Sequence, residues 1–393
     1  MKKNRLKIVR FINTHPNWKT ILKKPPYSLS IREKGNYVLL KYIQGLSSFR
    51  KPMVCEARGL ILKKVGRKYV PVCVPFNKFF NYGGAFSQES VRKLSHRSIW
   101  NITDKIDGSL IKAFYDDGEW HIATNGSIDA REVSLTFPSE NLKTFYDMFM
   151  TANNNRIEWD KLDKGYTYMF ELVGKENACV VRYECDLYYL ARKSNYYCTE
   201  TPYKEDDCKG VEKLKRPPCL EIDFKSRKDN MLALKQYAKQ ILNNEDETGN
   251  FEGVVISDYG SQTRLKVKSR KYMELSQLKS GNNLRAKKIL LMILEEQDDD
   301  FVAMFPEFKP RFDGVRHKLI TWMSKIKKDI HYMCNHTWKD KMDFVEWAKT
   351  TTQPSIVFAG YGRDCESDEW LFEQVKRIYT RNIMKAIGLD DDE

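Results

Sequence analysis

The hydrophobic periodicity of this chain changes once along its length, and that change limits the possible folds more than any other feature. In the first part, short runs rich in β-branched and aromatic residues, such as 37–43 and 58–63, are typical of strands. Later, the apolar residues of 311–333 recur at steps of three and four, which predicts an amphipathic helix. We therefore expect an α+β domain over 1–275 and an all-helical domain over 276–393.

The same periodicities predict further elements within this plan. Strands are expected at 109–115, 120–124, 253–257 and 263–268, and helices at 139–152, 228–243 and 370–387. Gly388 follows the last of these helices, at a position where a C-cap glycine is common. The polar residues 276–283 lie between the two expected domains and are predicted to link them.

The chain carries a large excess of positive charge, with 67 Lys and Arg against 53 Asp and Glu and a net charge of +14. This excess favours a polyanionic partner such as nucleic acid, although a solvated basic surface accounts for it equally well. The longest aliphatic run, 289–294, is too short to cross a membrane, and no secretory signal is expected. The nine cysteines include no Cys-x-x-Cys pair, which argues against a zinc ribbon or a disulfide scaffold and favours a cytoplasmic location.

The strongest local signal is the sequence Lys-Ile-Asp-Gly-Ser-Leu at residues 105–110, just before a predicted strand. In an extended segment the side chains of Lys105 and Asp107 point to the same side, and Gly108 can admit a close ligand. A lysine beside a carboxylate suits nucleophilic attack by an amine on a phosphate. Taken alone, the pattern is also common in ordinary turns, so its neighbours decide the interpretation.

Charged residues in three later segments favour the same chemistry. Residues 166–172 alternate, so that their apolar side chains share one face and Glu171 lies on the other. Glu252 stands at the start of an apolar strand. Lys266 and Lys268 share one strand face, which is unfavourable unless an anion such as a triphosphate lies near them. For that strand alone, lysines that protect a sheet edge are the simpler interpretation.

These motifs, in this order, resemble the covalent nucleotidyltransferase superfamily of ligases and capping enzymes, and in detail the phage RNA ligase 1 family of T-even phages. The resemblance also includes Arg-Gly at 58–59, Lys-Phe-Phe-Asn at 78–81 and Asn-Gly-Ser at 125–127, and it is strongest over 37–272. It implies an ATP-grasp-like nucleotidyltransferase domain of antiparallel sheets and helices. The all-α domain that follows would select tRNA.

The resemblance implies that Lys105 attacks the α-phosphorus of ATP and becomes Lys-AMP. Lys266 and Lys268 would favour its neutral amine and neutralise the phosphates. The implied catalytic residues are Lys105, Glu171, Glu252, Lys266 and Lys268. The implied nucleotide contacts are Tyr42, Arg58, Lys78, Phe80, Gly108, Lys266 and Lys268.

A divalent cation, Mg²⁺ or Mn²⁺, is the second cofactor that the resemblance implies. Asp107 and Glu252 would surround it, in part through water. Asp299 is a further candidate ligand for a structural cation, with a solvated helix boundary as an equal alternative. The His and Cys residues of 331–336 also form a cluster, but they lie near a predicted helix end, where a metal site is the less favoured interpretation.

Two further positions follow from the resemblance. Tyr272 would act in a later step of the reaction. The family pattern has lysines where this chain has Ala123 and Asn125, and the second of those lysines is regarded as functional. Asn125 can form hydrogen bonds but supplies no charge, so that contact differs here.

The implied function is an ATP-dependent RNA ligase that joins 5′-phosphate and 3′-hydroxyl ends through Lys-AMP and RNA-adenylate. The expected substrate is RNA, in particular a nicked tRNA in the cytoplasm of a phage-infected host, with no membrane and no obligate protein partner. Ser109 favours this reading, because DNA ligases and capping enzymes of the superfamily usually carry arginine there. A DNA ligase, a GTP-using capping enzyme and a non-catalytic RNA-binding protein remain as alternatives.

Overall fold

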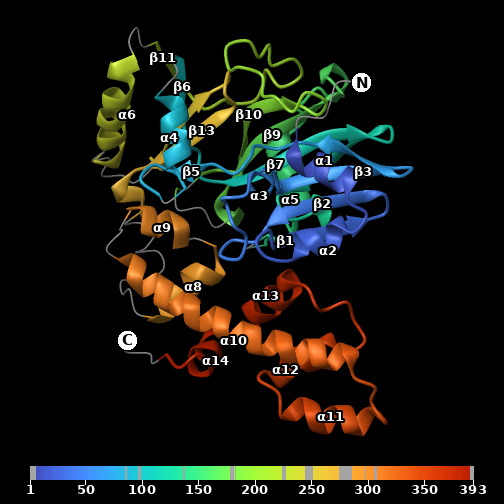
Figure 1. The fold of residues 1–393 in the computed structure, drawn as a ribbon. Helices are drawn as coiled ribbons and strands as arrows, with labels where there is room; N and C mark the ends of the chain where they lie inside the picture. Colours follow the sequence, from blue (N-terminus) through green and yellow to red (C-terminus); the bar gives the residue numbers. More distant parts are fainter. Residues whose placement is uncertain are drawn as a thin grey trace. The chain divides into compact units, whose positions relative to one another are not determined.

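The computed structural model describes residues 6–84, 86–95, 99–135, 138–177, 181, 183–223, 227–243, 251–273, 286–296, 298–304 and 308–389. The chain divides into two compact units (Figure 1). Unit 1 comprises Met1–Ile21, Ile31–Tyr42 and Phe49–Gly281. Unit 2 comprises Leu22–Ser30, Ile43–Ser48 and Asn282–Glu393, so two N-terminal segments belong with the C-terminal helices. The predicted linker at 276–283 lies outside the described residues.

Three sheets form the β part of the chain. The first has the order β1-β2-β3-β4, the second β10-β9-β7-β8, and the third β11-β6-β12-β13-β5. The first contains β1 Leu29–Lys34, β2 Tyr37–Tyr42, β3 Arg58–Val65 and β4 Lys68–Cys73. The second contains β7 Ser109–Asp116, β8 Glu119–Thr124, β9 Tyr166–Val173 and β10 Asp186–Ser194. The third contains β5 Phe80–Asn81, β6 Ile99–Asp104, β11 Cys219–Asp223, β12 Gly253–Asp258 and β13 Thr263–Lys268.

The helices of the N-terminal part cover faces of these sheets. They are α1 Lys7–Thr14, α2 Trp18–Lys23, α3 Pro52–Glu56, α4 Gln88–Leu94, α5 Phe145–Asn153 and α6 Arg227–Leu242, with short 3₁₀ turns at Ala130–Glu132, Trp159–Lys161 and Lys175–Asn177. Helices α4 and α6 pack on the third sheet, against a core that includes the apolar residues of β12 and β13. Helix α5 packs on β9 and β10 of the second sheet.

The observed α5 starts later than predicted. The expected helix at 139–152 begins only at Phe145, because Thr144 and Asp147 form a capping box in which each side chain accepts from the other's backbone N–H. The residues before Thr144 therefore lie outside the helix. The predicted helix at 228–243 is confirmed by α6, and the turn at Asp117 and Gly118 joins β7 to β8 with positive φ angles of 49° and 91°.

Unit 2 is helical in its C-terminal part. Its helices are α8 Ala286–Leu294, α9 Asp298–Met304, α10 Lys309–Asn335, α11 Lys341–Lys349, α12 Pro354–Gly360, α13 Asp368–Lys376 and α14 Thr380–Ala386. The apolar stripe of 311–333 is buried in the core of this unit, which confirms the predicted amphipathic helix. Ile43, from one of the two N-terminal segments, lies in the same core. The structure thus confirms the α+β class with a helical C-terminal region.

The predicted single helix at 370–387 is wrong, because two helices occupy this stretch. Helix α13 ends at Lys376, and Tyr379 is the extended N-cap of α14 with ψ 127°. A β-branched, an aromatic and another β-branched residue follow one another at 378–380, and such residues are weak helix formers. None of the helices in the described part of the chain is long and apolar enough to cross a membrane.

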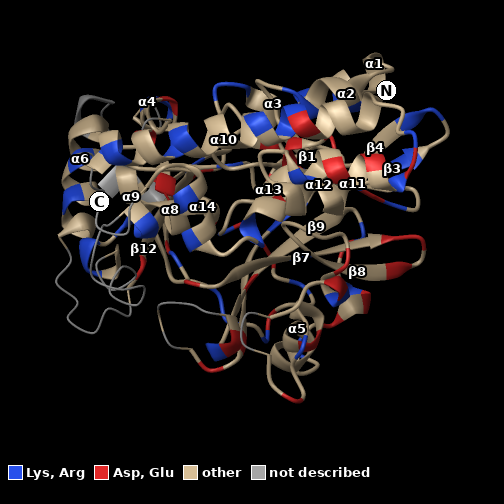
Figure 2. Cartoon of the chain, turned by 90° about the horizontal axis from the view of Figure 1, so that it is seen from below, with Lys and Arg blue, Asp and Glu red and all other residues tan. Residues whose placement is uncertain are grey.

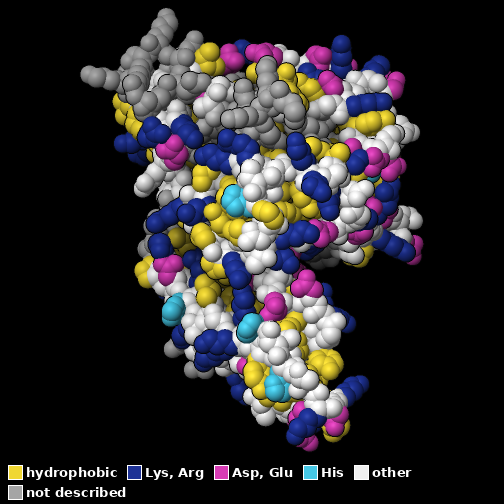
Figure 3. All heavy atoms as spheres, turned by 45° about the vertical axis from the view of Figure 1, so that its right-hand side comes forward, with side chains coloured by type: hydrophobic (Ala, Val, Ile, Leu, Met, Phe, Trp, Pro, Cys, Tyr) yellow, Lys and Arg dark blue, Asp and Glu magenta, His cyan; other side chains and the backbone are white. Residues whose placement is uncertain are grey.

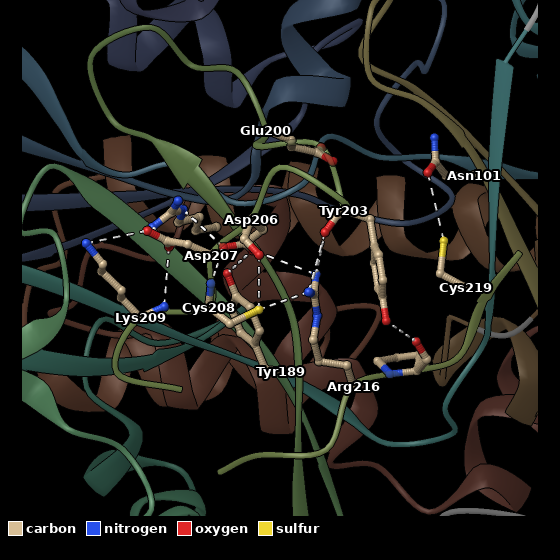
Figure 4. A network of polar contacts seen from close by, with 12 residues as sticks. Asn101, Tyr189, Glu200, Tyr203, Asp206, Asp207, Cys208, Lys209, Arg216 and Cys219 are labelled. Carbon is tan, nitrogen blue, oxygen red and sulfur yellow. Dashed lines mark hydrogen bonds and ion pairs between the residues drawn. The ribbon is translucent and has the colours of Figure 1, made fainter. Parts of the chain in front are cut away.

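The segment that follows β10 is fastened to the second sheet by buried polar contacts (Figure 4). The Tyr189 hydroxyl donates to Asp206 Oδ2 at 2.5 Å, and Arg192 Nε lies 3.3 Å from Asp206 Oδ1. The Arg216 guanidinium carbon lies 3.7 Å from the centre of the Tyr203 ring. These contacts fix the loop that also carries Glu200.

Charged residues of both signs occur along the described part of the chain. Lys and Arg alternate with Asp and Glu on helices and loops of both units (Figure 2). On the face shown in Figure 3, cationic side chains lie beside exposed hydrophobic ones. The surface therefore suits nucleic acid in its sign, but it does not by itself mark the binding site.

Candidate active site

The order of strands in the third sheet brings three distant residues to one end of it. Lys105 follows β6, Glu252 precedes β12, and Lys268 ends β13. Strand β12 lies between β6 and β13 and is antiparallel to both, so the start of β12 meets the ends of its two neighbours. The backbone N–H of Lys105 donates to the Gly253 carbonyl at 2.8 Å, which fixes the segment that carries the lysine.

A single carboxylate joins the two lysines. Lys105 Nζ lies 2.7 Å from Glu252 Oε2, and Lys268 Nζ lies 3.1 Å from Glu252 Oε1. The side chain of Glu252 is only 2% exposed and that of Lys105 is 22% exposed. A buried carboxylate keeps its charge at low energy only when cations surround it. Glu252 therefore holds the Lys105 amine in place while leaving it accessible.

Two glycines allow this close packing. Gly253 has φ 143°, and a Cβ there would lie 2.1 Å from the Val267 carbonyl oxygen of β13. A Cβ on Gly108 would lie 2.6 Å from the Leu172 carbonyl oxygen and 2.8 Å from Glu171 Cγ. From the sequence, the lack of a side chain at Gly108 was predicted to admit a close ligand. In the structure, the neighbour that a Cβ on Gly108 would meet is β9. Gly108 thereby brings the Lys105 segment against Glu171.

Two more carboxyl groups of this region are electrostatically coupled to Glu252. Burial raises the pKa of Glu171 to about 7, and the Lys105 charge acts against that rise. Burial, together with the charge of Glu252, raises the pKa of Asp107, while a hydrogen bond from the Val181 N–H at 3.0 Å acts against it. The accumulated negative charge suits a hydrated cation.

The described residues include no group of three or more His, Cys, Asp or Glu side chains placed to share one metal ion. Asp107 and Glu252 nevertheless offer the hard oxygen donors that Mg²⁺ and Mn²⁺ prefer, and Mg²⁺ commonly uses one or two carboxylates with water and substrate phosphates. Asp107 and Glu252 therefore suit a metal ion that binds together with the nucleotide. Asp299 belongs to unit 2, where its carboxylate accepts a hydrogen bond from the Gln44 amide.

The predicted phosphate and nucleotide contacts fall into two places. Arg58 begins β3, its charge acts on the pKa of Glu171, and its buried Nη1 has no hydrogen-bond partner among the described residues. A buried guanidinium nitrogen without a partner is a candidate anion contact. Lys78, by contrast, lies among aromatic rings, with its Nζ 5.0 Å from the centre of Tyr42 and 5.8 Å from that of Phe80.

Lys268 and Tyr272 adjoin the same carboxylates, and Lys266 shares a strand face with Lys268. Lys266 and Lys268 lie on the face of β13 opposite Leu265 and Val267, which pack in the helix-covered core. The buried Tyr272 lies beside Lys268, whose Nζ is 5.3 Å from its ring centre, and a hydrogen bond with Tyr272 lowers the pKa of Asp107. The structure thus brings Lys105, Asp107, Glu171, Glu252, Lys268 and Tyr272 together.

A lysine that the sequence analysis missed lies beside this site. Lys112 on β7 is fully buried, and its Nζ donates to the Gly59 carbonyl at 2.6 Å. Burial lowers the pKa of Lys112 to about 8. Lys112 pairs across the sheet with Ala123, and within the part of the chain that the structure describes the buried Oδ1 of Asn125 has no hydrogen-bond partner. The signal in the sequence is a single lysine inside an otherwise apolar strand.

Comparison with known proteins places these features in a family. A family model described as RNA ligase matches residues 56–273. A protein of Autographa californica nuclear polyhedrosis virus, named as a bifunctional polynucleotide kinase/RNA ligase, is 29% identical over 66% of this chain and 36% of its own length. This chain therefore spans about a third of that relative. An RNA ligase of Rhodothermus phage RM378 is 25% identical over 76% of this chain and 78% of its own length.

A solved archaeal ATP-dependent RNA ligase is 13% identical, with a TM-score of 0.44 over 88% of this chain and 89% of that one. The family match itself covers more than half of the chain and includes every residue from Arg58 to Tyr272 described above. The chain therefore belongs to the RNA ligase family.

Proposed function

We propose that this protein is an ATP-dependent RNA ligase whose nucleophile is Lys105. The observation that carries the proposal is the Lys105–Glu252–Lys268 arrangement, in which a buried carboxylate joins a partly exposed lysine to a second cation. An edge-strand lysine needs no such partner. The family to which the chain belongs supports the reaction class.

In the first step the Lys105 amine attacks the α-phosphorus of ATP. A nitrogen–phosphorus bond forms, the bond to the bridging oxygen breaks, and pyrophosphate leaves. The amine proton passes to the Glu252 carboxylate, whose Oε2 is 2.7 Å away. Lys268 and Lys266, with Arg58, would stabilise the charge on the phosphates.

In the following steps the AMP group moves from Lys105 to RNA. A 5′-phosphate oxygen of RNA attacks the AMP phosphorus and releases the lysine, giving RNA-adenylate. The 3′-hydroxyl of a second end then attacks the activated 5′-phosphate and releases AMP. Asp107 and Glu252 would hold a hydrated Mg²⁺ or Mn²⁺, which neutralises phosphate charge when bound. Glu171 would accept a hydrogen bond from the ribose.

The proposed natural substrate is a nicked tRNA in the cytoplasm of a phage-infected cell, with unit 2 as the part that selects it. Of the basic residues on α10, Lys325 and Lys328 are exposed, whereas Arg316 and Lys327 are paired with Asp298 and Asp368. Exposed lysines one helical turn apart can contact neighbouring phosphates. This support is for a basic contact, and the identity of the RNA rests on the resemblance.

Incubation of the purified protein with radioactive ATP or GTP, followed by denaturing electrophoresis, tests the proposal. We expect a covalent AMP adduct with ATP alone, which disappears in Lys105→Ala and persists in Lys209→Ala, whose lysine is 70% exposed. Labelling by GTP instead would favour a capping enzyme. A folded protein that forms no adduct would favour the non-catalytic alternative.

A further inference from the structure

A cavity of about 690 Å³ opens in unit 1 beside the edge strand β5. None of Lys105, Glu252 and Lys268 lines it. Its wall contains Phe49, Phe80 and Phe86, and cationic side chains stand around it. The cavity is therefore not formed by the lysine–carboxylate centre itself. Its lining does include Lys78 and Phe80, two of the implied nucleotide contacts, so ATP is the occupant that the test must distinguish from RNA.

The aromatic wall is a cluster of rings in mutual contact. The ring centres of Phe49 and Phe80 are 5.5 Å apart, and Phe86 lies 5.6 Å from each of them. The rings are tilted at 39° to 75° to one another, so they present faces in different directions. Phe80 and Phe86 are partly exposed, whereas Phe49 is buried and Lys78 Nζ lies 4.9 Å from its ring centre. A partly exposed aromatic ring in a polar cavity is suited to stacking with an unpaired base.

The charges around the cavity leave it attractive to an anion. Arg50 is exposed and forms no ion pair within the described part of the chain. The three carboxylates of the lining already have partners. Glu89 is paired with Arg92 at 2.8 Å, and Glu56 accepts from the backbone N–H groups of Lys7 and Ile8 at 3.1 and 2.8 Å. Glu200 accepts from the Arg264 guanidinium at 2.6 and 2.9 Å. A phosphate beside Arg50 would therefore meet a cation rather than competing carboxylates.

The cavity lies on the same side of the third sheet as the reacting lysine. Arg264 lines the cavity. Arg264, Lys266 and Lys268 occupy every second position of β13, so their side chains lie on the same face of the strand. Lys268 contacts Glu252 at the other end of that row. At ~3.3 Å per residue, the four-residue step along β13 spans about 13 Å. A strand of RNA with its end at Lys105 reaches that far within a few nucleotides.

We propose that this cavity binds an unpaired nucleotide of an RNA strand close to the end that is joined. Its base stacks on Phe86, and its phosphate lies against Arg50. The proposal rests on the proposed function and deepens it, because it names where the polynucleotide is held. The strand can be the one with the 5′-phosphate or the one with the 3′-hydroxyl, since both present a base and a phosphate.

The test uses the full chain with Phe86→Ala, Phe86→Tyr and Arg50→Ala, and Arg67→Ala as an exposed control. Binding of a fluorescent single-stranded RNA is followed by anisotropy at several salt concentrations, which requires no catalysis. We expect Phe86→Ala to weaken binding roughly tenfold, because base stacking on an aromatic ring is lost, and Phe86→Tyr to bind like the wild type. Arg50→Ala should weaken binding and reduce the salt slope by about one.

Sealing assays then separate the possible occupants. The KM of each strand is measured with the other strand saturating, and we expect Phe86→Ala to raise it for one strand only. Lys-AMP formation by these variants should depend on ATP as in the wild type. An ATP dependence shifted by Phe86→Ala would assign the cavity to ATP and overturn the proposal. Unchanged RNA binding in folded Phe86→Ala and Arg50→Ala would also overturn the proposal for the cavity. A wild-type protein that forms no Lys-AMP adduct would contradict only the proposed function.

Discussion

Lys105 and Lys112 belong to the segment that enters and forms β7, yet their amines lie in opposite surroundings. Lys105 is partly exposed and its amine contacts the Glu252 carboxylate. Lys112 is fully buried, and its amine contacts one carbonyl oxygen, that of Gly59. A carboxylate partner can accept the proton of an amine that a substrate reaches, whereas burial without a carboxylate penalises a charged amine. The two lysines therefore differ in the group that their amine contacts and in whether a substrate can reach that amine.

The largest effect should follow from removing the accessible amine. Lys105→Ala should abolish Lys-AMP formation, because no other lysine can supply the attacking nitrogen at that position. Lys112→Met should still form the adduct. Gel labelling with radioactive ATP measures both. Sealing of pre-adenylated RNA should survive better in Lys105→Ala, since that step starts after the lysine has acted. An adduct in Lys105→Ala would break the comparison.

The next effect concerns the cations that accompany Lys105. Lys266→Ala should slow single-turnover adenylylation on the order of 10²-fold, because a cation that stabilises developing phosphate charge is removed. Lys215→Ala, at a 62% exposed lysine paired with Asp186, is the matched control. A near wild-type rate for Lys266→Ala would show that its position on β13 serves only to protect the strand.

The buried amine predicts a pH-dependent stability. The pKa of Lys112 is about 8 in the folded chain, against 10.5 for an ordinary lysine. Its burial penalty is therefore fully present below about pH 8 and disappears as the pH rises toward that ordinary value. Lys112→Met should remove a penalty on the order of 3 kcal/mol at pH 7, offset by about 1 kcal/mol for the lost hydrogen bond to Gly59.

Urea unfolding of the wild type and Lys112→Met at pH 7 and pH 10 measures this difference. The gain in the free energy of unfolding should be larger at pH 7 than at pH 10. Lys209→Met, at an exposed position, should show no such pH dependence. An equal gain at both pH values would mean that burial does not lower the pKa of Lys112 in the folded protein.

The smallest effect, a change in substrate preference, is expected from exposed lysines that form no ion pair with the described residues. Replacing both Lys325 and Lys328 by alanine should lower the preference for nicked tRNA over linear RNA several-fold and reduce the salt slope of tRNA binding by about two. Lys-AMP formation should not change. The measurement is the ratio of sealing efficiencies on the two substrates at fixed salt. An unchanged ratio would remove these lysines from substrate selection.

The features that follow from local periodicity could be predicted from the sequence. Alternation in 166–172 predicts β9 with Glu171 away from its apolar face, and Tyr168 and Phe170 do pack in the core of the second sheet. The stripe on α10 is equally local. Helix ends were less predictable, because the start of α5 depends on one pair of capping groups.

Features that depend on distant partners could not be predicted in the same way. The motif order suggested that Lys105 and Glu252 meet, but only the position of β12 between β6 and β13 explains why. The burial of Lys112 depends on Gly59, which lies in a different sheet. The cavity wall combines Phe49, Phe80 and Phe86 from separate segments. Their spacing in the sequence does not predict that their rings are in contact.

The discontinuity of unit 2 has a consequence for the synthesis of the chain. Residues 22–30 and 43–48 are synthesised before the helices that complete their unit, and the long segment 49–281 is synthesised between them. Domains usually fold as their residues emerge, starting from the N-terminus. In this chain, the core that contains Ile43 can form only after α8 and α10 have been synthesised. The apolar side chains of these early segments therefore remain without their final neighbours until the C-terminal helices have been synthesised, a period in which chaperones would shield them from aggregation.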